Sequence, residues 1–300
     1  MKTRFSISDS IFNTINIVLT AILLVIMIYP LYFTIIASIS NPHQVALGNV
    51  IFLPKEFTLE VYSNIFNNSQ LWLGYRNTVL YTFFGVIWNL LLTIPCAYAL
   101  TKRGLKGRGI IMGIFVFTMF FSGGMIPTYL LIKDLNLINN PLVMILPGGA
   151  SVYYLIVTRT SLSSSIPDSI LEAAKIDGAG EFRIFASIVL PLSKAIIAVM
   201  ALFYGVGHWN SFFNALIYIS DSRLFPLQLI LRNILILNQE LRIDITAAET
   251  EQIALALRRA NMAEAMKYGI IFIASLPVLI AYPFVQKYFV KGVMIGSIKG

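Results

Sequence analysis

Residues 171–181 of this chain read LEAAKIDGAGE, and residues 188–191 read IVLP. The first stretch gathers acidic and basic side chains into a short span, although long uncharged apolar runs lie on both sides of it. Charge inside a bilayer is costly, so such a polar segment belongs at a membrane surface. We therefore expect residues 171–191 to lie on one side of a membrane, where they are accessible to a soluble partner protein.

The composition is that of a membrane protein. Of the 300 residues, 57% are hydrophobic and only 12% are charged, with a mean hydropathy of +0.79. A soluble domain carries roughly 25% charged residues, and an apolar run of about 18 residues or more is long enough to span a bilayer as a helix. The sequence predicts an all-α, polytopic protein with six transmembrane helices in one domain, residues 1–300. The six predicted spans are Ile15–Ile39, Thr78–Leu100, Gly109–Ile132, Pro141–Thr158, Ala195–Ile219 and Tyr268–Gln286.

The distribution of basic residues predicts the orientation. The tight turn over residues 102–108 holds four Lys and Arg side chains, whereas the short loops on the opposite side hold only Lys55, Arg76 and Lys133. Short cytoplasmic loops carry the excess of Lys and Arg, so both termini are expected in the cytoplasm. The loop over about 159–194 is then cytoplasmic, and the long loop over about 220–267 is extracellular. The net charge of +8 follows this loop pattern and does not indicate a nucleic-acid partner.

The cytoplasmic loop has the pattern of two short helices separated by glycine. Ser165 and Asp168 fit a capping box, which predicts a helix that continues through Ile176. Gly178 and Gly180 can end this helix and permit a sharp reversal, because glycine adopts positive φ without steric cost. A second helix over Glu181–Ser187 would expose Phe182 and Phe185. Two interpretations remain open on these grounds: the phenylalanines enter a groove of a partner protein, or they lie in the membrane surface.

The same loop resembles the EAA loop of ATP-binding-cassette (ABC) importer permeases, which docks the ATPase. The matching residues are Glu172, Ala173, Ala174, Asp177 and Gly178, followed by Ile188, Leu190 and Pro191. The resemblance extends over nearly the whole chain, with further matches at residues 121–128, 207–211 and 288–300. It is to the carbohydrate-uptake permeases, which include the smaller maltose permease subunit and the oligosaccharide permeases of Gram-positive bacteria.

This resemblance implies the type I importer permease fold and a place in the cell membrane. The implied partners are a second permease subunit, two ATPase subunits, an extracellular solute-binding lipoprotein and an oligosaccharide. The chain is then expected to bind no cofactor itself, because ATP and Mg²⁺ are held by the ATPases. The residues that the resemblance assigns to ATPase coupling are Glu172, Ala173, Ala174, Asp177, Gly178, Phe182 and Phe185.

Polar and aromatic side chains inside the spans are candidates for the substrate path. Amide, imidazole and aromatic groups suit a sugar, which presents hydroxyls and apolar C–H faces. The candidates are Tyr204, His208, Trp209, Asn210 and Asn214 in the fifth span, and Tyr81 and Trp88 in the second. Such residues also join transmembrane helices by hydrogen bonds, so a packing role stays open for each of them.

The sequence contains no motif that predicts a catalytic reaction. It lacks the G-x-x-x-x-G-K-[ST] motif of P-loop ATPases, and no nucleophile–base or paired-carboxylate constellation stands out in the spans. Two histidines and one cysteine do not predict a metal site. The predicted function is inward transport of an oligosaccharide by alternating access. The alternatives are a permease of the same fold for an amino acid, peptide or phosphate, and an integral-membrane enzyme.

Overall fold

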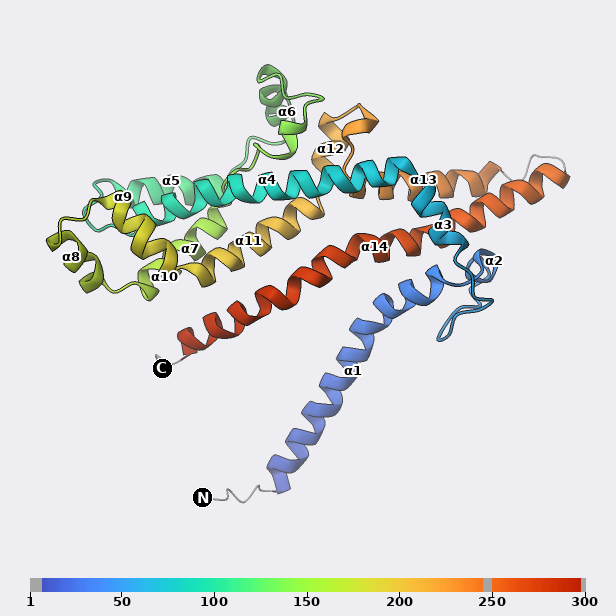
Figure 1. The fold of residues 1–300 in the computed structure, drawn as a ribbon, viewed down its shortest axis with the longest axis horizontal. Coiled ribbons are helices and arrows are strands. Elements are labelled where there is room, and N and C mark those ends of the chain that lie inside the picture. Colours follow the sequence, from blue (N-terminus) through green and yellow to red (C-terminus); the bar gives the residue numbers. More distant parts are fainter. Residues whose placement is uncertain (1–6, 245–249, 298–300) are drawn as a thin grey trace. The chain divides into compact units, whose positions relative to one another are not determined.

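The computed structural model describes residues 7–244 and 250–297, and all regular structure within them is helical. The elements labelled in Figure 1 are all helices. The chain divides into two compact units. Unit 1 contains residues 1–69 and 231–276, and unit 2 contains residues 70–230 and 277–300. The helical, multi-span class of fold predicted from composition is confirmed.

Unit 1 is built on the first helix, α1 (Ile7–Ser38), followed by α2 (Pro42–Ala46) and α3 (Glu60–Asn67). It also includes most of α13 (Leu227–Asp244) and the first part of α14 (Thr250–Ser297). Phe33 of α1 packs edge-on against Tyr268 of α14, with ring centroids 5.3 Å apart. These aromatic rings cover a small apolar cluster that joins the end of α1 to the loop after it.

Unit 2 carries the charged segment over residues 171–191. Its long helix is α4 (Ser69–Ala99). The elements that follow it are α5 (Arg108–Phe120), α6 (Met125–Asp134), η1 (Pro141–Met144), α7 (Val152–Ser165), α8 (Asp168–Ile176), α9 (Glu181–Ile184), η2 (Phe185–Val189), α10 (Leu190–Leu192), α11 (Lys194–Trp209), α12 (Phe213–Tyr218) and η3 (Ser222–Leu224).

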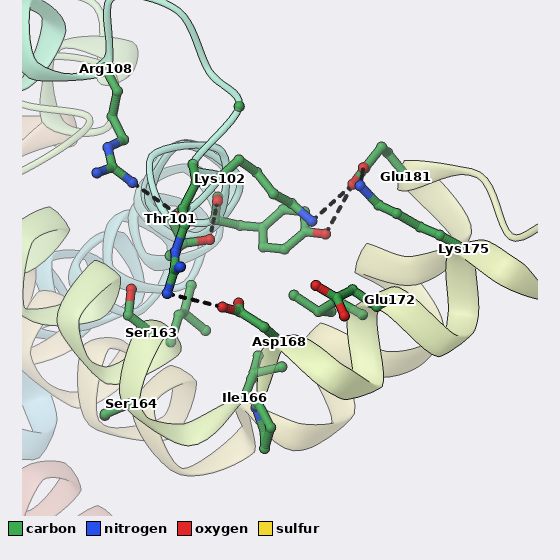
Figure 2. Close-up of a pocket in the computed structure, with 16 residues that line it drawn as sticks. Thr101, Lys102, Arg108, Ser163, Ser164, Ile166, Asp168, Glu172, Lys175 and Glu181 are labelled. Carbon is green, nitrogen blue, oxygen red and sulfur yellow. Dashed lines mark hydrogen bonds and ion pairs between the residues drawn. The ribbon is translucent and has the colours of Figure 1, made fainter.

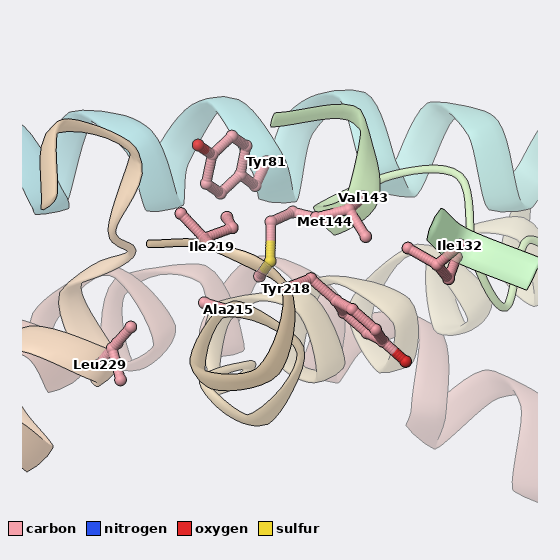
Figure 3. Packing of buried hydrophobic residues seen from close by; sticks show 8 residues of the cluster. All are labelled: Tyr81, Ile132, Val143, Met144, Ala215, Tyr218, Ile219 and Leu229. Carbon is pink, nitrogen blue, oxygen red and sulfur yellow. The ribbon is translucent and has the colours of Figure 1, made fainter. Parts of the chain in front are cut away.

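The first half of α4 binds the segment before α13 through buried polar groups. The Asn77 amide donates to the carbonyls of Arg223 and Phe225, at 2.8 and 3.1 Å. The Thr78 hydroxyl accepts the backbone N–H of Leu227 at 2.8 Å. An apolar cluster beside these bonds packs Tyr81 with residues of α6, η1 and α12 (Figure 3). Because the polar groups are buried and paired, they fix this end of the unit without the cost of unmet hydrogen bonds.

Three predicted spans appear as single long helices. By length and composition, Ile11–Ser38, Ser69–Ala99 and Ala254–Phe284 are long and apolar enough to cross a membrane. Two bent helix pairs raise this count to as many as five among the described residues. The second span begins at Ser69, before the predicted Thr78, so Arg76 lies within α4 and not in an outer loop.

The third and fifth predicted spans are broken helices. Helices α5 and α6 meet at an angle of 111°, at a break where Gly124 adopts a φ of +86°. In the fifth span, α11 ends at Trp209 and α12 begins only at Phe213. Hydropathy does not register such breaks, because they depend on backbone conformation and not on side-chain polarity.

The fourth predicted span also differs from expectation. Residues 141–158 form the 3₁₀ turn η1, an irregular stretch and only then α7, because Pro147 and Gly148 (φ +69°) interrupt the helix. The predicted loop over about 220–267 is largely helical, since α13 and the start of α14 occupy it. The sixth span is therefore part of one 48-residue helix.

Candidate functional site

The charged stretch forms α8, which begins later than predicted. Ser165 ends α7, and the residue that precedes α8 is Pro167, with φ −61° and ψ 137° and no side-chain cap. The predicted capping box is therefore wrong. Proline disfavours the helical conformation in the residue before it, and Ile166 is extended with φ −115° and ψ 105°. This turn separates α8 from α7 and allows it to take a new direction.

The predicted glycine reversal after α8 is confirmed. Gly178 has a φ of +77°. Its backbone N–H donates to the Lys175 carbonyl at 3.0 Å, and the N–H of Ala179 donates to the Ala174 carbonyl at 2.9 Å. These bonds satisfy the last carbonyls of α8, as in helix ends that use a left-handed glycine. Gly180, in contrast, is extended with φ −67° and directly precedes α9.

The chain then returns through α9, the π turn η2 and α10. We refer to residues 168–192 as the α8–α10 segment. It joins α11 at Ser193 with a bend of 78° between Glu181–Leu192 and Lys194–Trp209. The second short helix is thus present, but the helical stretch runs past the predicted end at Ser187. It includes Pro191, which lies in α10 and so precedes α11.

An apolar cluster holds the inner face of this segment. It joins α8, α9 and η2 to the end of α4 and to α7. Its buried members are Ala97, Tyr98, Leu162, Ile166, Ala174, Ile184 and Val189. Phe185 packs on this cluster, with its ring centroid 5.3 Å from that of Tyr98. The prediction that Phe185 is exposed together with Phe182 is therefore wrong, because burial of its ring against Tyr98 is favourable.

The outer face of the segment is both apolar and charged. Phe182 is 82% exposed and Ile176 is 87% exposed. The Glu172 and Asp177 side chains are also exposed, and neither forms an ion pair or a hydrogen bond with the described part of the chain. Large apolar side chains beside unpaired carboxylates are typical of a protein-binding surface. Ala173 shares this exposed face, whereas Ala174 is buried beneath it.

One carboxylate, that of Glu181, gathers three donors (Figure 2). Its Oε1 lies 2.8 Å from the Lys175 Nζ, and its Oε2 lies 3.1 Å from the Lys102 Nζ. The Tyr98 hydroxyl donates to Oε2 at 3.2 Å. The hydrogen bonds from Lys175 and Lys102 lower the pKa of Glu181 to about 2. Burial alone lowers the pKa of Lys102, but its contacts with Tyr98 and Glu181 outweigh burial and raise it.

A cleft of about 880 Å³ lies between α8 and the basic turn after α4. Arg103 crosses it to Asp168, with an N–O distance of 3.1 Å. Arg108 donates to the Thr101 carbonyl at 3.3 Å. Glu172 lines the same cleft, as Figure 2 shows. The described residues contain no group of three or more His, Cys, Asp or Glu side chains suited to a metal ion.

The proposed substrate-path residues of α11 are joined to other elements. The Tyr204 hydroxyl lies 2.7 Å from Thr93 Oγ1 and accepts the Ser151 N–H at 3.1 Å. His208 Nε2 lies 2.7 Å from Asn89 Oδ1, and the Asn89 amide donates to the Gly149 carbonyl at 2.9 Å. These bonds hold the irregular segment before α7 between α4 and α11.

The remaining candidates divide into packed and accessible groups. Tyr81 donates to the Leu224 carbonyl at 3.0 Å, and Trp88 donates to the Leu146 carbonyl at 3.3 Å. Trp209 is buried against Tyr75, with ring centroids 5.6 Å apart. Asn210 is exposed and Asn214 is half-buried. The structure thus gives Tyr81, Trp88, Tyr204 and His208 packing contacts, and leaves Asn210 and Asn214 more accessible.

Two residues of the site were not singled out from the sequence. From the sequence, Lys102 is one of four basic residues in a turn, and Tyr98 is an aromatic residue in an apolar run. Their pairing with Glu181 joins residues that are far apart in the chain, so only the folded arrangement reveals it. The sequence signal for them is weak: a cationic and an aromatic residue at the end of an apolar helix.

Comparison with known proteins defines the class. Residues 71–295 match the family described as binding-protein-dependent transport system inner membrane component, and the chain belongs to that family. It is 39% identical to Protein LplC of Bacillus subtilis (strain 168) over 97% of this chain and 95% of the relative. It is 36% identical to the polygalacturonan/rhamnogalacturonan transport system permease protein YtcP of the same organism, over 92% and 93% of the two chains.

A solved structure supports the same fold. It is a chain of a bacterial ABC transporter described as involved in the import of the acidic polysaccharide alginate. The TM-score is 0.83 at 33% sequence identity, with 95% of this chain and 99% of that chain covered. The ABC importer permease fold predicted from the EAA resemblance is therefore confirmed, and this chain is a membrane protein of a transport family.

Proposed function

We propose that this chain is the permease subunit of an ABC importer that moves an oligosaccharide into the cell. The observation that carries the proposal is the likeness to the alginate importer chain over 95% of the sequence. The exposed face of the α8–α10 segment supports it, because Glu172, Asp177 and Phe182 extend from a segment packed on the ends of α4 and α7. That face is suited to an ATPase subunit.

The proposed mechanism is alternating access in one permease domain over residues 1–300. Closure of two partner ATPases, which hold ATP and Mg²⁺, displaces the α8–α10 segment. The displacement reaches the helices that follow, and the cavity shared with a second permease subunit opens to an extracellular solute-binding lipoprotein. The chain itself catalyses no reaction. Asn210 and Asn214 are the accessible polar groups that we assign to the sugar path.

Reconstitution tests the proposed function. We expect proteoliposomes that contain both permeases, the ATPases and the binding protein to accumulate oligosaccharide only when ATP and the binding protein are both present. Omission of the ATPases should abolish accumulation. An isolated chain that converts a substrate chemically without ATPase subunits would establish the rival class, an integral-membrane enzyme.

Relatives named for acidic polysaccharides indicate the substrate class. We propose an oligosaccharide that contains uronic acid, because the YtcP and alginate importer relatives are named for polygalacturonan/rhamnogalacturonan and alginate. The structure supports this with a cation on α4: Arg76 is exposed and lies one helical turn from Trp72. A guanidinium binds a carboxylate in a bidentate manner, and an aromatic ring offers a flat surface to a sugar.

A substrate panel is expected to distinguish acidic from neutral sugars. Oligogalacturonate or oligo-alginate should stimulate ATP hydrolysis by the full complex, whereas arabino-oligosaccharides and raffinose should not. Arg76→Gln should raise the KM for the acidic sugar about tenfold, equivalent to about 1.4 kcal/mol. Lys133→Gln, another exposed outer cation, is the matched control and should leave KM unchanged. Equal stimulation by neutral sugars would contradict the acidic assignment.

Cysteine labelling is expected to establish the orientation, with both termini in the cytoplasm. In a Cys96→Ser background, a membrane-impermeant maleimide should label Asn68→Cys in intact cells. Lys106→Cys lies in the exposed turn after α4 and should react only after the membrane is opened. Labelling of Lys106→Cys in intact cells would reverse the orientation and place the α8–α10 segment outside.

A further inference from the structure

The covalent route from the α8–α10 segment into the membrane is a bent one. The segment contains the π turn η2 and meets α11 at 78° after a break at Ser193. Sharp kinks occur where the regular hydrogen-bond ladder of a helix is interrupted, as at a π turn or at the break at Ser193. A displacement of α8 and α9 is therefore only partly transmitted along the chain to α11.

A second route exists through α4 and does not follow the chain. Lys102 and Tyr98, at the cytoplasmic end of α4, both reach Glu181 of α9. The Lys102 Nζ also lies 4.3 Å from the centroid of the Tyr98 ring. The same ring packs against Phe185 of η2, with centroids 5.3 Å apart. Tyr98 thus contributes a hydroxyl, a cation–π surface and an apolar surface to one junction.

The two salt bridges to the turn after α4 differ in their surroundings. The Lys102 side chain is 23% exposed and that of Glu181 is 57% exposed, and Glu181 also accepts from Lys175 and Tyr98. The Arg103–Asp168 pair is open to water, with side chains 86% and 64% exposed. Exposed pairs contribute little on their own, whereas a carboxylate that accepts from three donors belongs to a network and is held more firmly than one in a single pair. Of these two salt bridges, the Lys102–Glu181 pair is therefore the one suited to transmit a displacement from α9 to α4.

We propose that Tyr98, Lys102 and Glu181 form a clamp that joins the ATPase-docking segment to α4, so that its displacement reaches α4 directly as well as α11. The inference rests on the proposed function. These are positioning residues, since they act through the docking face and contact neither ATP nor substrate. The matched control is Arg103, which lies beside Lys102 in the same turn.

Acidity affects the clamp only far below physiological pH. The folded-state pKa of Glu181 is about 2, below its ordinary value of 4.5. A lowered carboxyl pKa stabilises the folded arrangement above the ordinary value and loses this effect as pH falls through the folded value. The clamp is therefore complete above about pH 4.5 and opens only as pH falls towards 2.

Side-chain replacement in the full complex tests the clamp. Lys102→Met and Glu181→Gln should each lower uptake per ATP hydrolysed about tenfold, with basal ATP hydrolysis and co-purification of the ATPases retained. The double variant should lose no more than Glu181→Gln alone, because both substitutions weaken the same Lys102–Glu181 contact. Arg103→Met should behave as wild type. Additive losses, or an equal loss in Arg103→Met, would overturn the proposal.

A cross-link distinguishes force transmission from simple stabilisation. In a Cys96→Ser background, Lys102→Cys and Glu181→Cys can be joined by a short bis-thiol reagent. If the junction between α4 and α9 transmits the displacement, bridging should raise the uptake of this double variant about tenfold, back towards the wild-type level; no gain on bridging would overturn the clamp. Failure of the proposed function is distinguishable, because the ATPases would then fail to co-purify even with the unsubstituted chain.

Discussion

Gly178→Val is expected to abolish uptake while the chain still inserts and pairs with its sister permease. Gly178 has a φ of +77°, and a left-handed conformation costs a residue with a Cβ roughly 1–2 kcal/mol. This energy corresponds to a factor of about 5–30 in a conformational equilibrium. No atom lies within 4 Å of the added Cβ, so the effect comes from the backbone, which redirects α9.

Gly180→Val provides the matched control for this prediction. Gly180 is two residues away and equally open around its Cβ, but its φ is −67°. Valine adopts that extended conformation readily, so uptake should remain near the wild-type level. Uptake measured in vesicles of equal permease content distinguishes the two variants. If both variants transport normally, the glycine reversal has no role in coupling.

Phe182→Ala is expected to release the ATPases from the permease. The Phe182 side chain is 82% exposed, so its removal should not change the melting temperature of the permease. Burial of a phenylalanine in a partner contributes about 1.5–3 kcal/mol, and aromatic anchors dominate many interfaces. We therefore expect the Kd for the ATPase subunit to rise about 10- to 100-fold, as measured by titration of the purified permease pair.

Phe185→Ala should show the opposite pattern. Phe185 packs on Tyr98 in the apolar cluster beneath the segment. Its truncation removes internal packing, so the melting temperature of the permease pair should fall, whereas the Kd for the ATPase should change little.

An unchanged ATPase affinity in the Phe182→Ala variant would show that the Phe182 ring lies elsewhere, for example in the membrane surface.

Local features of the charged segment could be predicted from the sequence because they depend on local physics. The end of α8 at Ile176 and the reversal at Gly178 follow from helix propensity and from the freedom of glycine. The start of α8 was predicted wrongly, because Pro167 imposes an extended residue before it and Ser165 stays in α7. The capping signal at Ser165 and the helix-breaking effect of Pro167 are of similar strength, so the sequence alone does not decide between them.

Features that depend on tertiary contacts could not be predicted. His208 is a polar residue in an apolar run, for which a sugar path and a packing role both stay open from the sequence. Its hydrogen bond with Asn89 at 2.7 Å is visible only in the fold. The breaks in the third and fifth spans depend on backbone angles that hydropathy does not measure. The contact between Lys102 and Glu181 likewise joins residues distant in the sequence.

The central claim is that the exposed face of the α8–α10 segment binds an ATPase subunit. A photoreactive benzoyl-phenylalanine at Phe182, in the assembled complex in membranes, tests it most directly, and one at Ile110 of α5, also exposed, is the control. The account predicts a cross-linked adduct with the ATPase from position 182 and none from position 110. Adducts only with lipid from position 182 would contradict it.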